Sequence, residues 1–583
     1  MRLLESEQYY KSSFEPSAKG LSVLRTGKII SEDESPAQMI DRIVIDLASV
    51  EVLFNTPEPL IRQFAISLGE QMDSGKIVFS TPIMTNANKA EQRPLSACTI
   101  PPVDLRGSLQ DVKKMVDIYH QEAMGTGFDL TQVDDPVRVL LFLNNVAAAG
   151  AESGREDRPV GNMATCRIDH PKILDFIRSK ADRPDVNWKF NISVDIPDSF
   201  WYAVENNEVW HLSDGTDIKA TELLHEIAVS AHGCADPGII CLDRLNADNP
   251  TPNIGLYTST APCAEVGLVP GETCQFGYLN LAKFIDKSSN SIDYQKLAES
   301  AWLLTRSLDN AMELSISRYT IRESARVMSQ KRKIGVGVCG LADMLVHLGI
   351  PYGSESARDL CRDVVSFINY QTKVASHNLA KTRGSFAAMN SVLKTRYSEN
   401  PGFIEQKYGA LNTNTVSVNE WKQLGSVIRE TQMLRNSSTV SLPPTGRSGL
   451  VVSASTGVEP LFTLVSDGEI HPALFEQLKK YGLADQVTIS KIYETGSCQN
   501  SALPNEIKNI FKTATEINPW EHLKMVSAIL PCVDESISKT INLPNEATVA
   551  EVESIYMEAH RSGLKGVTIY RNGSVKNQPR KVA

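Results

Sequence analysis

The segment Thr-Ala-Pro-Cys-Ala-Glu, residues 260–265, holds the pair of side chains best suited to chemistry. Cys263 and Glu265 stand two positions apart, so in an extended loop their side chains point to the same side. The cysteine can act as a nucleophile or as a radical carrier, and the carboxylate can act as a general acid or base. Cys274 follows eleven residues after Cys263, close enough to return to the same pocket. Because a Cys-x-Glu triplet is common by chance, the pair needs support from the rest of the chain.

A second candidate site is the turn at residues 444–449, with the sequence PTGRSG, which follows the strand-like run STVSLP. A glycine-containing turn with two hydroxyl side chains and exposed N–H groups can bind a phosphate, and Arg447 adds a planar, two-pronged donor. The turn lacks the lysine and the spacing of a Walker loop. Phosphate binding and an ordinary structural turn both remain open at this position.

Two other motifs favour structure over chemistry. Residues 335–340, GVGVCG, match G-x-G-x-x-G, but a dinucleotide site needs an apolar strand before it, and here Ile334 follows the polar run SQKRK. We expect a close-packed turn that leads into a helix over 341–349. His225 and His232 are seven residues apart, which does not match the H-E-x-x-H spacing of zinc proteases. We therefore expect two ordinary helix histidines and no metal site.

Composition limits the class of protein. The chain has 583 residues, of which 42% are hydrophobic and 22% charged, as in an ordinary globular protein. No run approaches the ~18 uninterrupted apolar residues of a membrane span, and the N-terminus lacks a signal pattern, so we expect a cytoplasmic location. A net charge of −10 argues against a general nucleic-acid or membrane-surface binder. The ten cysteines include no C-x-x-C pair, which leaves zinc-ribbon and thioredoxin-type sites without support.

The order of elements predicts an α/β fold. Apolar spacings of three and four predict a helix around residues 39–47, and FNISVDIP at 190–197 alternates like a strand. Residues 247–274 are rich in turn formers and predict a loop, whereas 293–383 is largely helical. Residues 520–570 read as helix, strand, helix and strand. This alternation implies a parallel α/β sheet or barrel in one large catalytic domain behind a helical N-terminal cap.

A dozen collinear segments resemble the catalytic subunit of ribonucleotide reductase, specifically its adenosylcobalamin-dependent class II. The segments are FSTPIM (79–84), SACTIPP (96–102), GTGFDL (125–130), GNMATCRIDHPKILDFI (161–177), FNISVDIPDSFW (190–201), DRLNADNPTP (243–252), APCAEVGLVPGETCQFGYLNLA (261–282), RKIGVGVCGLADML (332–345), RNSSTVSLPPTGRSG (435–449), GVEPLF (457–462), DESISKTINLPNEATVAEV (534–552) and GLKGVTIYRNGS (563–574). Each segment is modest alone, but their shared order over most of the chain makes the resemblance specific.

The resemblance implies a fold and a chemistry. The fold is a ten-stranded α/β barrel of two parallel half-barrels with a central finger loop, plus a helical N-terminal region. Cys263 matches the residue at which adenosylcobalamin generates a thiyl radical, and Glu265 matches the carboxylate that takes the 3′-hydroxyl proton. Cys98 and Cys274 match the pair that delivers two reducing equivalents while the 2′-hydroxyl leaves as water.

The resemblance also implies binding sites and partners. The substrate is a ribonucleotide, and the expected substrate-binding residues are Thr81, Ala97, Gly125, Ala261, Pro444, Thr445, Gly446, Arg447 and Ser448. An external thiol reductant, thioredoxin-like or a small dithiol, would restore the active-site thiols, and a homodimer is compatible with the family. Neither DNA, RNA nor a membrane is an expected partner.

Four departures from the family pattern qualify these expectations. Ala261 replaces the Asn of Asn-x-Cys-x-Glu, and the usual Thr-Gly-Thr-Ile-Ser turn is Thr-Gly-Arg-Ser-Gly. The effector loop expected after FDL is missing, because Asp134-Asp135-Pro136 passes directly into the next helix, so we expect weak allosteric control. The fourth departure is the expected short tail at 576–583, which has no cysteine pair. Before it, we expect residues 1–75 to form a helical region without an ATP cone and residues 76–575 to form the barrel.

Three functions follow from this pattern. The first is reduction of a ribonucleotide to the deoxyribonucleotide by a class II enzyme; class I ranks lower because Tyr570 stands alone where a tandem tyrosine pair is needed. The second is a diverged radical enzyme that acts on another nucleotide-like substrate, motivated by Ala261 and Arg447. The third is a catalytically silent nucleotide-binding homologue. Retention of both active-site thiols, the radical cysteine and the carboxylate argues against silence.

Overall fold

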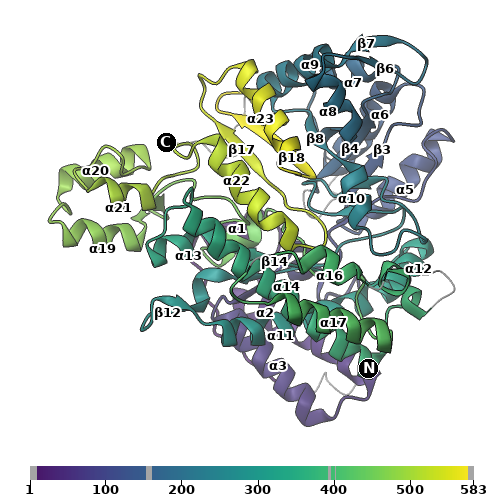
Figure 1. Cartoon of the computed structure of the whole chain (residues 1–583). Coiled ribbons are helices and arrows are strands. Elements are labelled where there is room, and N and C mark those ends of the chain that lie inside the picture. The colour runs from purple at the N-terminus through teal and green to yellow at the C-terminus, as the bar shows by residue number, and fades with distance from the viewer. Residues whose placement is uncertain (1–8, 153–159, 391–394, 401, 412, 575–583) are drawn as a thin grey trace.

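The computed structural model describes residues 9–152, 160–390, 395–400, 402–411 and 413–574. Two sheets lie at its centre, and helices cover them (Figure 1). The mixed α/β fold predicted from the alternation of strands and helices is confirmed. The expected tail at 576–583 lies outside the described residues.

The larger sheet has seven strands. In order across the sheet they are β17 (Thr540–Leu543), β18 (Gly566–Arg571), β8 (Gly238–Ile240), β5 (Phe190–Asp195), β4 (Asn162–Arg167), β3 (Gly125–Asp129) and β2 (Cys98–Thr99). All neighbours are parallel except β18 and β8, which are antiparallel. The strand predicted at 190–197 is confirmed as β5. The helices of this half are α5 (Leu109–Gln121), α6 (Pro136–Glu152), α7 (Ile173–Arg178), α8 (Asp198–Glu205), α9 (Ala220–Cys234), α10 (Leu242–Asp248), α22 (Pro519–Ile529) and α23 (Val549–Arg561), and β6 (Val209–His211) pairs with β7 (Asp217–Lys219).

The smaller sheet has three strands, β1 (Ile77–Phe79), β11 (Phe276–Asn280) and β14 (Gly335–Cys339). Strand β11 is antiparallel to β1 and parallel to β14. Isolated bridges continue the pairing beyond these strands. Val336 pairs in parallel with Val440, Leu442 pairs in parallel with Ile537, and Thr99 of β2 pairs antiparallel with Thr273. These bridges connect the smaller sheet toward both edges of the larger one.

The glycine motif at 335–340 corrects one expectation. We predicted a close-packed turn there, but residues 335–339 form strand β14, and only Gly340, with φ +68°, turns the chain into α13 (Leu341–Leu348). The physical reason lies in strand β11. A Cβ on Gly337 would approach the ring of Tyr278 to 3.0 Å, and one on Gly335 would collide with the ring of Phe276. The glycines therefore make room for two aromatic rings, while the helix over 341–349 is confirmed.

Helices form the base of the molecule in Figure 1. The helices outside the half that holds the larger sheet include α1 (Ala18–Thr26), α2 (Pro36–Ser49), α3 (Glu58–Asp73), α4 (Thr81–Asn86), α11 (Tyr294–Arg318), α12 (Arg322–Lys331), α14 (Glu355–Arg383), α16 (Phe403–Tyr408) and α17 (Val418–Thr431). The helix predicted around 39–47 is confirmed as α2, whose apolar stripe is buried. Just after α2, the Glu51 carboxylate pairs with Arg306 and Arg383 and ties α2 to α11 and α14.

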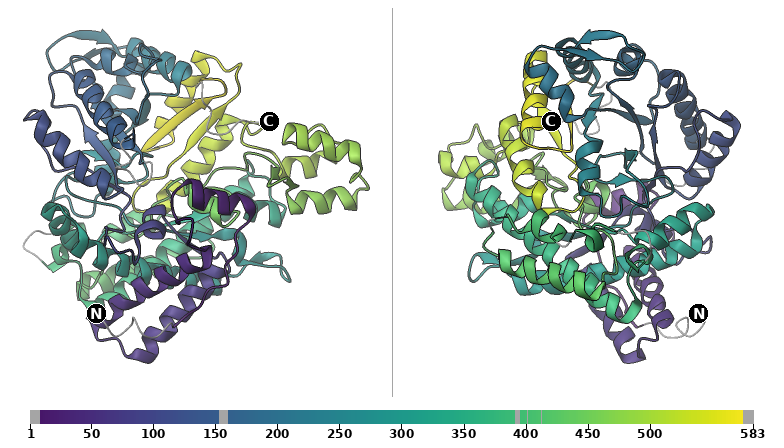
Figure 2. Two further views of the ribbon diagram at one scale, coloured as in Figure 1. Left: turned by 180° about the vertical axis from the view of Figure 1, so that it is seen from behind. Right: turned by 45° about the vertical axis from the view of Figure 1, so that its right-hand side comes forward.

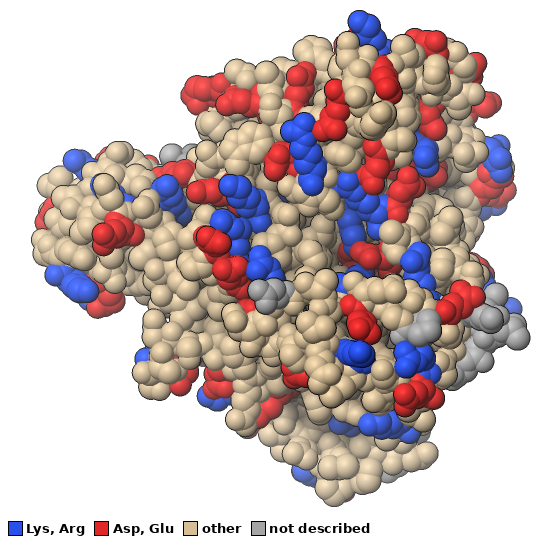
Figure 3. Space-filling model, in the orientation of Figure 1, with Lys and Arg blue, Asp and Glu red and all other residues tan. Residues whose placement is uncertain are grey.

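A separate lobe projects from the body between residues 461 and 511. Helices α19 (Pro472–Lys480), α20 (Gln486–Thr495) and α21 (Asn505–Ile510) surround a small core of their own, which includes Leu474 and Ile492. Both views of Figure 2 show the lobe standing clear of the sheets. Figure 3 shows acidic and basic side chains interspersed on the viewed face. Within the described residues, no helix is both long and apolar enough to span a bilayer.

Candidate active site

The segment with Cys263 and Glu265 forms the tip of a hairpin. Strands β9 (Ser259–Thr260) and β10 (Gly267–Leu268) pair antiparallel, and the Ala261 N–H donates to the Val266 carbonyl at 3.0 Å. Ala264 has φ +61°, and its N–H donates to the Ala261 carbonyl at 2.9 Å. The tip is thus a tight turn rather than the extended loop that we expected. It places Cys263 where solvent can reach it and leaves Glu265 buried.

Groups from both sheets hold this hairpin. On the side of the larger sheet, Thr165 of β4 donates from Oγ1 to Ser259 Oγ at 3.2 Å, and Asn191 of β5 donates from Nδ2 to the Pro262 carbonyl at 3.1 Å. On the other side, the Glu265 carbonyl accepts from Ser441 Oγ at 2.7 Å and from the Ser536 N–H at 3.0 Å. The hairpin therefore lies between the two halves of the fold.

A buried ionic cluster fixes the base of the hairpin. Lys333 Nζ donates to the Gly267 carbonyl at 2.8 Å and to the Tyr257 hydroxyl at 3.0 Å. The same ammonium lies 3.2 Å from a carboxylate oxygen of Glu272 and 3.2 Å from one of Glu535. Lys331 also pairs with Glu272, at 2.7 Å; burial lowers the pKa of Lys331 to about 8 despite that partner. Sequence patterns did not reveal this cluster, because its members come from four separate segments.

Cys98 and Cys274 meet through their backbones. The Cys274 N–H donates to the Cys98 carbonyl at 3.1 Å, and the Ala97 N–H donates to the Cys274 carbonyl at 3.0 Å. No disulfide joins the two residues in this structure. Gly125 lies beside Cys98 in the sheet, and a Cβ on it would lie 3.4 Å from Cys98 Sγ. The structure thus brings together two thiols that are far apart in sequence, with expected substrate residues Ala97 and Gly125 next to them.

The electrostatics of the hairpin tip favour neutral groups. Although Cys263 is exposed, desolvation by the surrounding protein raises the pKa of its thiol well above the usual value, and the nearby Glu265 and Cys98 raise it further. Burial also raises the pKa of Glu265 to about 7, although backbone N–H groups of Glu265 and Cys263 oppose this. Glu265 Oε2 is buried without a hydrogen-bond partner among the described residues. A thiol that stays protonated is a poor nucleophile but can still donate a hydrogen atom, so the raised pKa disfavours nucleophilic chemistry at Cys263.

The remaining expected binding residues lie on the smaller sheet and its extension. Thr81 begins α4, directly after Ser80, whose N–H donates to the Phe276 carbonyl at 3.0 Å. The turn at 444–448 leads into α18 (Gly446–Val451), and Thr445, with φ +53°, accepts the Gly457 N–H on Oγ1 at 2.8 Å. Arg447 is half-buried and makes no hydrogen bond or ion pair with the rest of the described chain.

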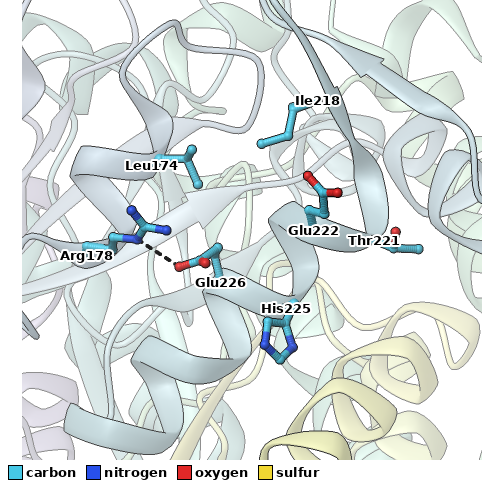
Figure 4. Close-up of a pocket in the computed structure, with 7 residues that line it drawn as sticks. All are labelled: Leu174, Arg178, Ile218, Thr221, Glu222, His225 and Glu226. Atoms are coloured by element: carbon cyan, nitrogen blue, oxygen red, sulfur yellow. Dashed lines mark hydrogen bonds and ion pairs between the residues drawn. The ribbon is translucent and has the colours of Figure 1, made fainter.

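One pocket of the described chain lies away from these residues. About 350 Å³ in volume, it lies between α7, β7 and α9, where Arg178 donates to Glu226 at 2.8 Å (Figure 4). His225 on its rim pairs with Glu553, and His232 bonds the Ala547 carbonyl, so both histidines have the structural roles that we expected. Among the described residues, no three His, Cys, Asp or Glu side chains cluster as metal ligands.

One buried residue near the paired cysteines was not singled out in the sequence. Tyr278 of β11 is buried and lies four positions after Cys274, on the same face of the extended chain. That even spacing was the available signal, but an aromatic residue in a buried strand is ordinarily part of the core.

The fold and the site together define a class of protein. The family model described as "Ribonucleotide reductase, barrel domain" matches residues 129–570. The chain belongs to the ribonucleotide reductase large-subunit family, and the resemblance noted in the sequence is confirmed.

Individual relatives agree with this assignment. The chain is 32% identical over 537 residues to the vitamin B12-dependent ribonucleoside-diphosphate reductase of Thermoplasma acidophilum, covering 87% of this chain and 65% of the relative. It is 33% identical over 458 residues to a protein of the same name from Mycobacterium tuberculosis, covering 76% and 60%. The chain thus spans somewhat under two thirds of the length of these relatives. The class Id ribonucleotide reductase alpha subunit of Actinobacillus ureae has a similar fold, with a TM-score of 0.74 at 17% identity over 96% of this chain and 98% of that one.

Proposed function

We propose that the chain is an adenosylcobalamin-dependent ribonucleotide reductase, which replaces the 2′-hydroxyl of a ribonucleotide by hydrogen. One arrangement carries the proposal: a hairpin tip with a thiol and a carboxyl group lies beside two cysteines whose backbones are hydrogen-bonded. The four residues are Cys263, Glu265, Cys98 and Cys274.

We infer that the two sheets form the ten-stranded barrel of the family. One half would consist of β2, β3, β4, β5 and β8, which are mutually parallel. The other would consist of β18, β17, the segment 440–442, β14 and β11, also mutually parallel through the bridges at Val440 and Leu442. Antiparallel contacts between β8 and β18, and between Thr99 and Thr273, would close the ring. The hairpin would then be the finger loop.

The proposed reaction balances over the four groups. A thiyl radical at Cys263 takes the hydrogen atom from C3′ and becomes a thiol, while Glu265 accepts the 3′-hydroxyl proton. The paired thiols together supply two electrons and two protons: one proton leaves with the 2′-hydroxyl as water, the other hydrogen ends on C2′, and the sulfurs close as a disulfide. Cys263 then returns the hydrogen atom to C3′ and regains its radical, and Glu265 returns its proton.

Cys263, the residue at which the chemistry requires access for the cofactor, has properties that fit this role. Cys263 is exposed, and the desolvation that the surrounding protein imposes on its thiol raises the pKa of that thiol and keeps it protonated as a hydrogen-atom donor. Adenosylcobalamin, when bound, supplies the one-electron chemistry that converts this thiol into a thiyl radical. The relatives from T. acidophilum and M. tuberculosis are named as vitamin B12-dependent, which supports the same cofactor here.

We propose that the substrate binds along the smaller sheet and its extension. Thr81, Ala97 and Gly125 would line the ribose, and Pro444, Thr445, Gly446, Arg447 and Ser448 would hold the phosphates. The disulfide would be reduced by an external dithiol, thioredoxin-like or small, and a homodimer is the proposed assembly.

A second candidate keeps the radical chemistry but changes the substrate. Ala261 has no amide to offer to Glu265, whose Oε2 lacks a partner among the described residues, and Arg447 adds a cation at the expected phosphate turn that pairs with no carboxylate of the described chain. Both changes fit a nucleotide-like substrate with different hydroxyl or anion positions. A silent homologue is disfavoured because all four reactive groups are present and brought together.

The test is an anaerobic assay with adenosylcobalamin, dithiothreitol and each ribonucleoside di- and triphosphate in turn. Chromatography of the products should show the deoxyribonucleotide of at least one base. Cobalamin-dependent consumption of a nucleotide without a deoxy product would favour the second candidate. No consumption of any nucleotide by the folded protein would contradict both.

A further inference from the structure

Tyr278 projects from strand β11 toward the hairpin side. The face of this segment that carries Gln275 and Gly277 is directed at helix α11. Gln275 Nε2 donates to Ser315 Oγ at 2.7 Å, and a Cβ on Gly277 would approach Leu304 to 2.6 Å. Successive side chains of a strand point to opposite faces. Cys274 and Tyr278 therefore share the face that is turned away from α11.

Short contacts connect Tyr278 to Glu265. A Cβ on Gly337 would lie 3.0 Å from Cδ1 of Tyr278 and 3.2 Å from the carbonyl oxygen of Ser441. Ser441 Oγ in turn donates to the Glu265 carbonyl at 2.7 Å. The tyrosine ring thus lies across Gly337, one strand away from the hairpin tip.

Two polar groups in this region make no hydrogen bond with the described residues. Glu265 Oε2 is buried without a partner, whereas the Tyr278 hydroxyl, on a side chain that is 5% exposed, is not among the buried atoms that lack one. A buried polar group without a partner costs free energy, so native structures rarely leave one beside an available hydroxyl unless a ligand or water satisfies it.

Electrostatics keep the phenol a donor. Burial raises the pKa of Tyr278 well above its usual value, and Glu265 is the next largest cause, ahead of Cys274, Cys98 and Cys339. The hydroxyl therefore stays protonated near neutral pH and lies within electrostatic reach of the carboxylate and of the paired thiols.

We propose that Tyr278 is a further substrate-binding residue, whose phenol donates a hydrogen bond to a ribose hydroxyl that itself donates to Glu265. A sugar hydroxyl can accept from the Tyr278 phenol and donate to the unpartnered Glu265 oxygen at once, because it accepts and donates in one position. The inference rests on the proposed function and deepens it: the site recognises a nucleotide with an intact ribose diol. Tyr278 would supply the ribose contact that Ala261, with no side-chain amide, cannot make.

The test compares binding without cobalamin, so that no turnover intervenes. Calorimetry would measure the ribonucleotide that the wild-type protein binds best, together with its 2′-deoxy and 3′-deoxy analogues. Tyr278→Phe removes only the hydroxyl. We expect it to bind the ribonucleotide about five- to tenfold more weakly, the loss of one good hydrogen bond, and to bind at least one of the deoxy analogues as the wild type does.

A matched control is Tyr556→Phe in α23, a fully buried tyrosine that donates to the Pro237 carbonyl at 3.2 Å. It should leave the preference for the diol unchanged. Equal weakening of all three ligands by Tyr278→Phe, or no weakening, would overturn the role of Tyr278 while leaving the proposed function intact. A wild-type protein that binds no ribonucleotide would contradict the proposed function itself, and this inference with it.

Discussion

Cys98 and Cys274 are direct cross-strand neighbours. Thr99 and Thr273 are antiparallel partners, which makes Cys98 and Cys274 the next pair along, and the Cys274 N–H donates to the Cys98 carbonyl at 3.1 Å. Residues opposite each other in such a pair have Cβ atoms about 4.5–5.5 Å apart, and a disulfide needs about 3.5–4.5 Å. On this general spacing, a small approach of the two residues would bring their sulfurs within bonding distance.

The first prediction concerns this pair. One anaerobic turnover without reductant should join Cys98 to Cys274, because the reaction that we propose draws two electrons from these thiols. Titration of free thiols before and after the turnover should show a loss of two, and peptide mapping should find the disulfide between these residues. Mapping of the disulfide to another pair would reject their role.

The second prediction concerns pH and activity. The pKa of Glu265 is raised to about 7, and a general base must be ionised, so kcat/KM should rise with pH up to about 7. Glu265→Gln should abolish turnover at every pH. A kcat/KM that is already maximal at pH 5 would contradict a base with this pKa.

The third prediction concerns pH and stability at the same residue. Its pKa of about 7 exceeds the ordinary 4.5, so the folded state holds a proton that the unfolded state loses. The associated stability is fully present below pH 4.5 and is lost as pH rises through 7, by up to about 3 kcal/mol. Glu265→Gln, which cannot ionise, should therefore gain stability relative to the wild type between pH 5 and pH 8 in denaturant titrations. Glu476→Gln, at an exposed position of α19, serves as the control and should show no such gain.

The fourth prediction concerns the ionic cluster below the hairpin. Lys333→Met leaves Glu535 buried without its cation and removes the donor to the Gly267 carbonyl. Loss of one partner of a buried ion pair costs about 3–5 kcal/mol, so the free energy of unfolding should fall by that order. Lys479→Met, at an exposed site, should cost little. Equal stability of the two variants would show that the cluster does not hold the hairpin.

The elements that sequence patterns predicted are those with strong local signals. Helix α2 and strand β5 show clear apolar periodicity, and their burial follows from it. Strand β14 was misjudged because its glycines are determined by the rings of Phe276 and Tyr278, which belong to another strand. The residues around β14 give no sign of the strand that carries these two rings.

The site also divides into residues that sequence motifs identify and residues that only the fold identifies. Cys263, Glu265 and the two remote thiols were found through motifs that resemble a family, since nothing in composition or spacing brings Cys98 to Cys274. Tyr278 and the Lys333 cluster belong to no motif and become visible only when separate strands are placed side by side. Their chemistry depends on burial and on the groups that lie next to them, and both are properties of the fold.

The most direct test of the account is the deoxyribonucleotide yield of Cys263→Ser in the anaerobic assay with adenosylcobalamin. Oxygen replaces sulfur with little change of volume at the solvent-accessible hairpin tip, so circular dichroism and thermal unfolding should match the wild type. A serine hydroxyl cannot carry the radical that a thiol carries, so we predict no deoxyribonucleotide above background. Substantial product from this variant would remove Cys263 from the mechanism and contradict the account.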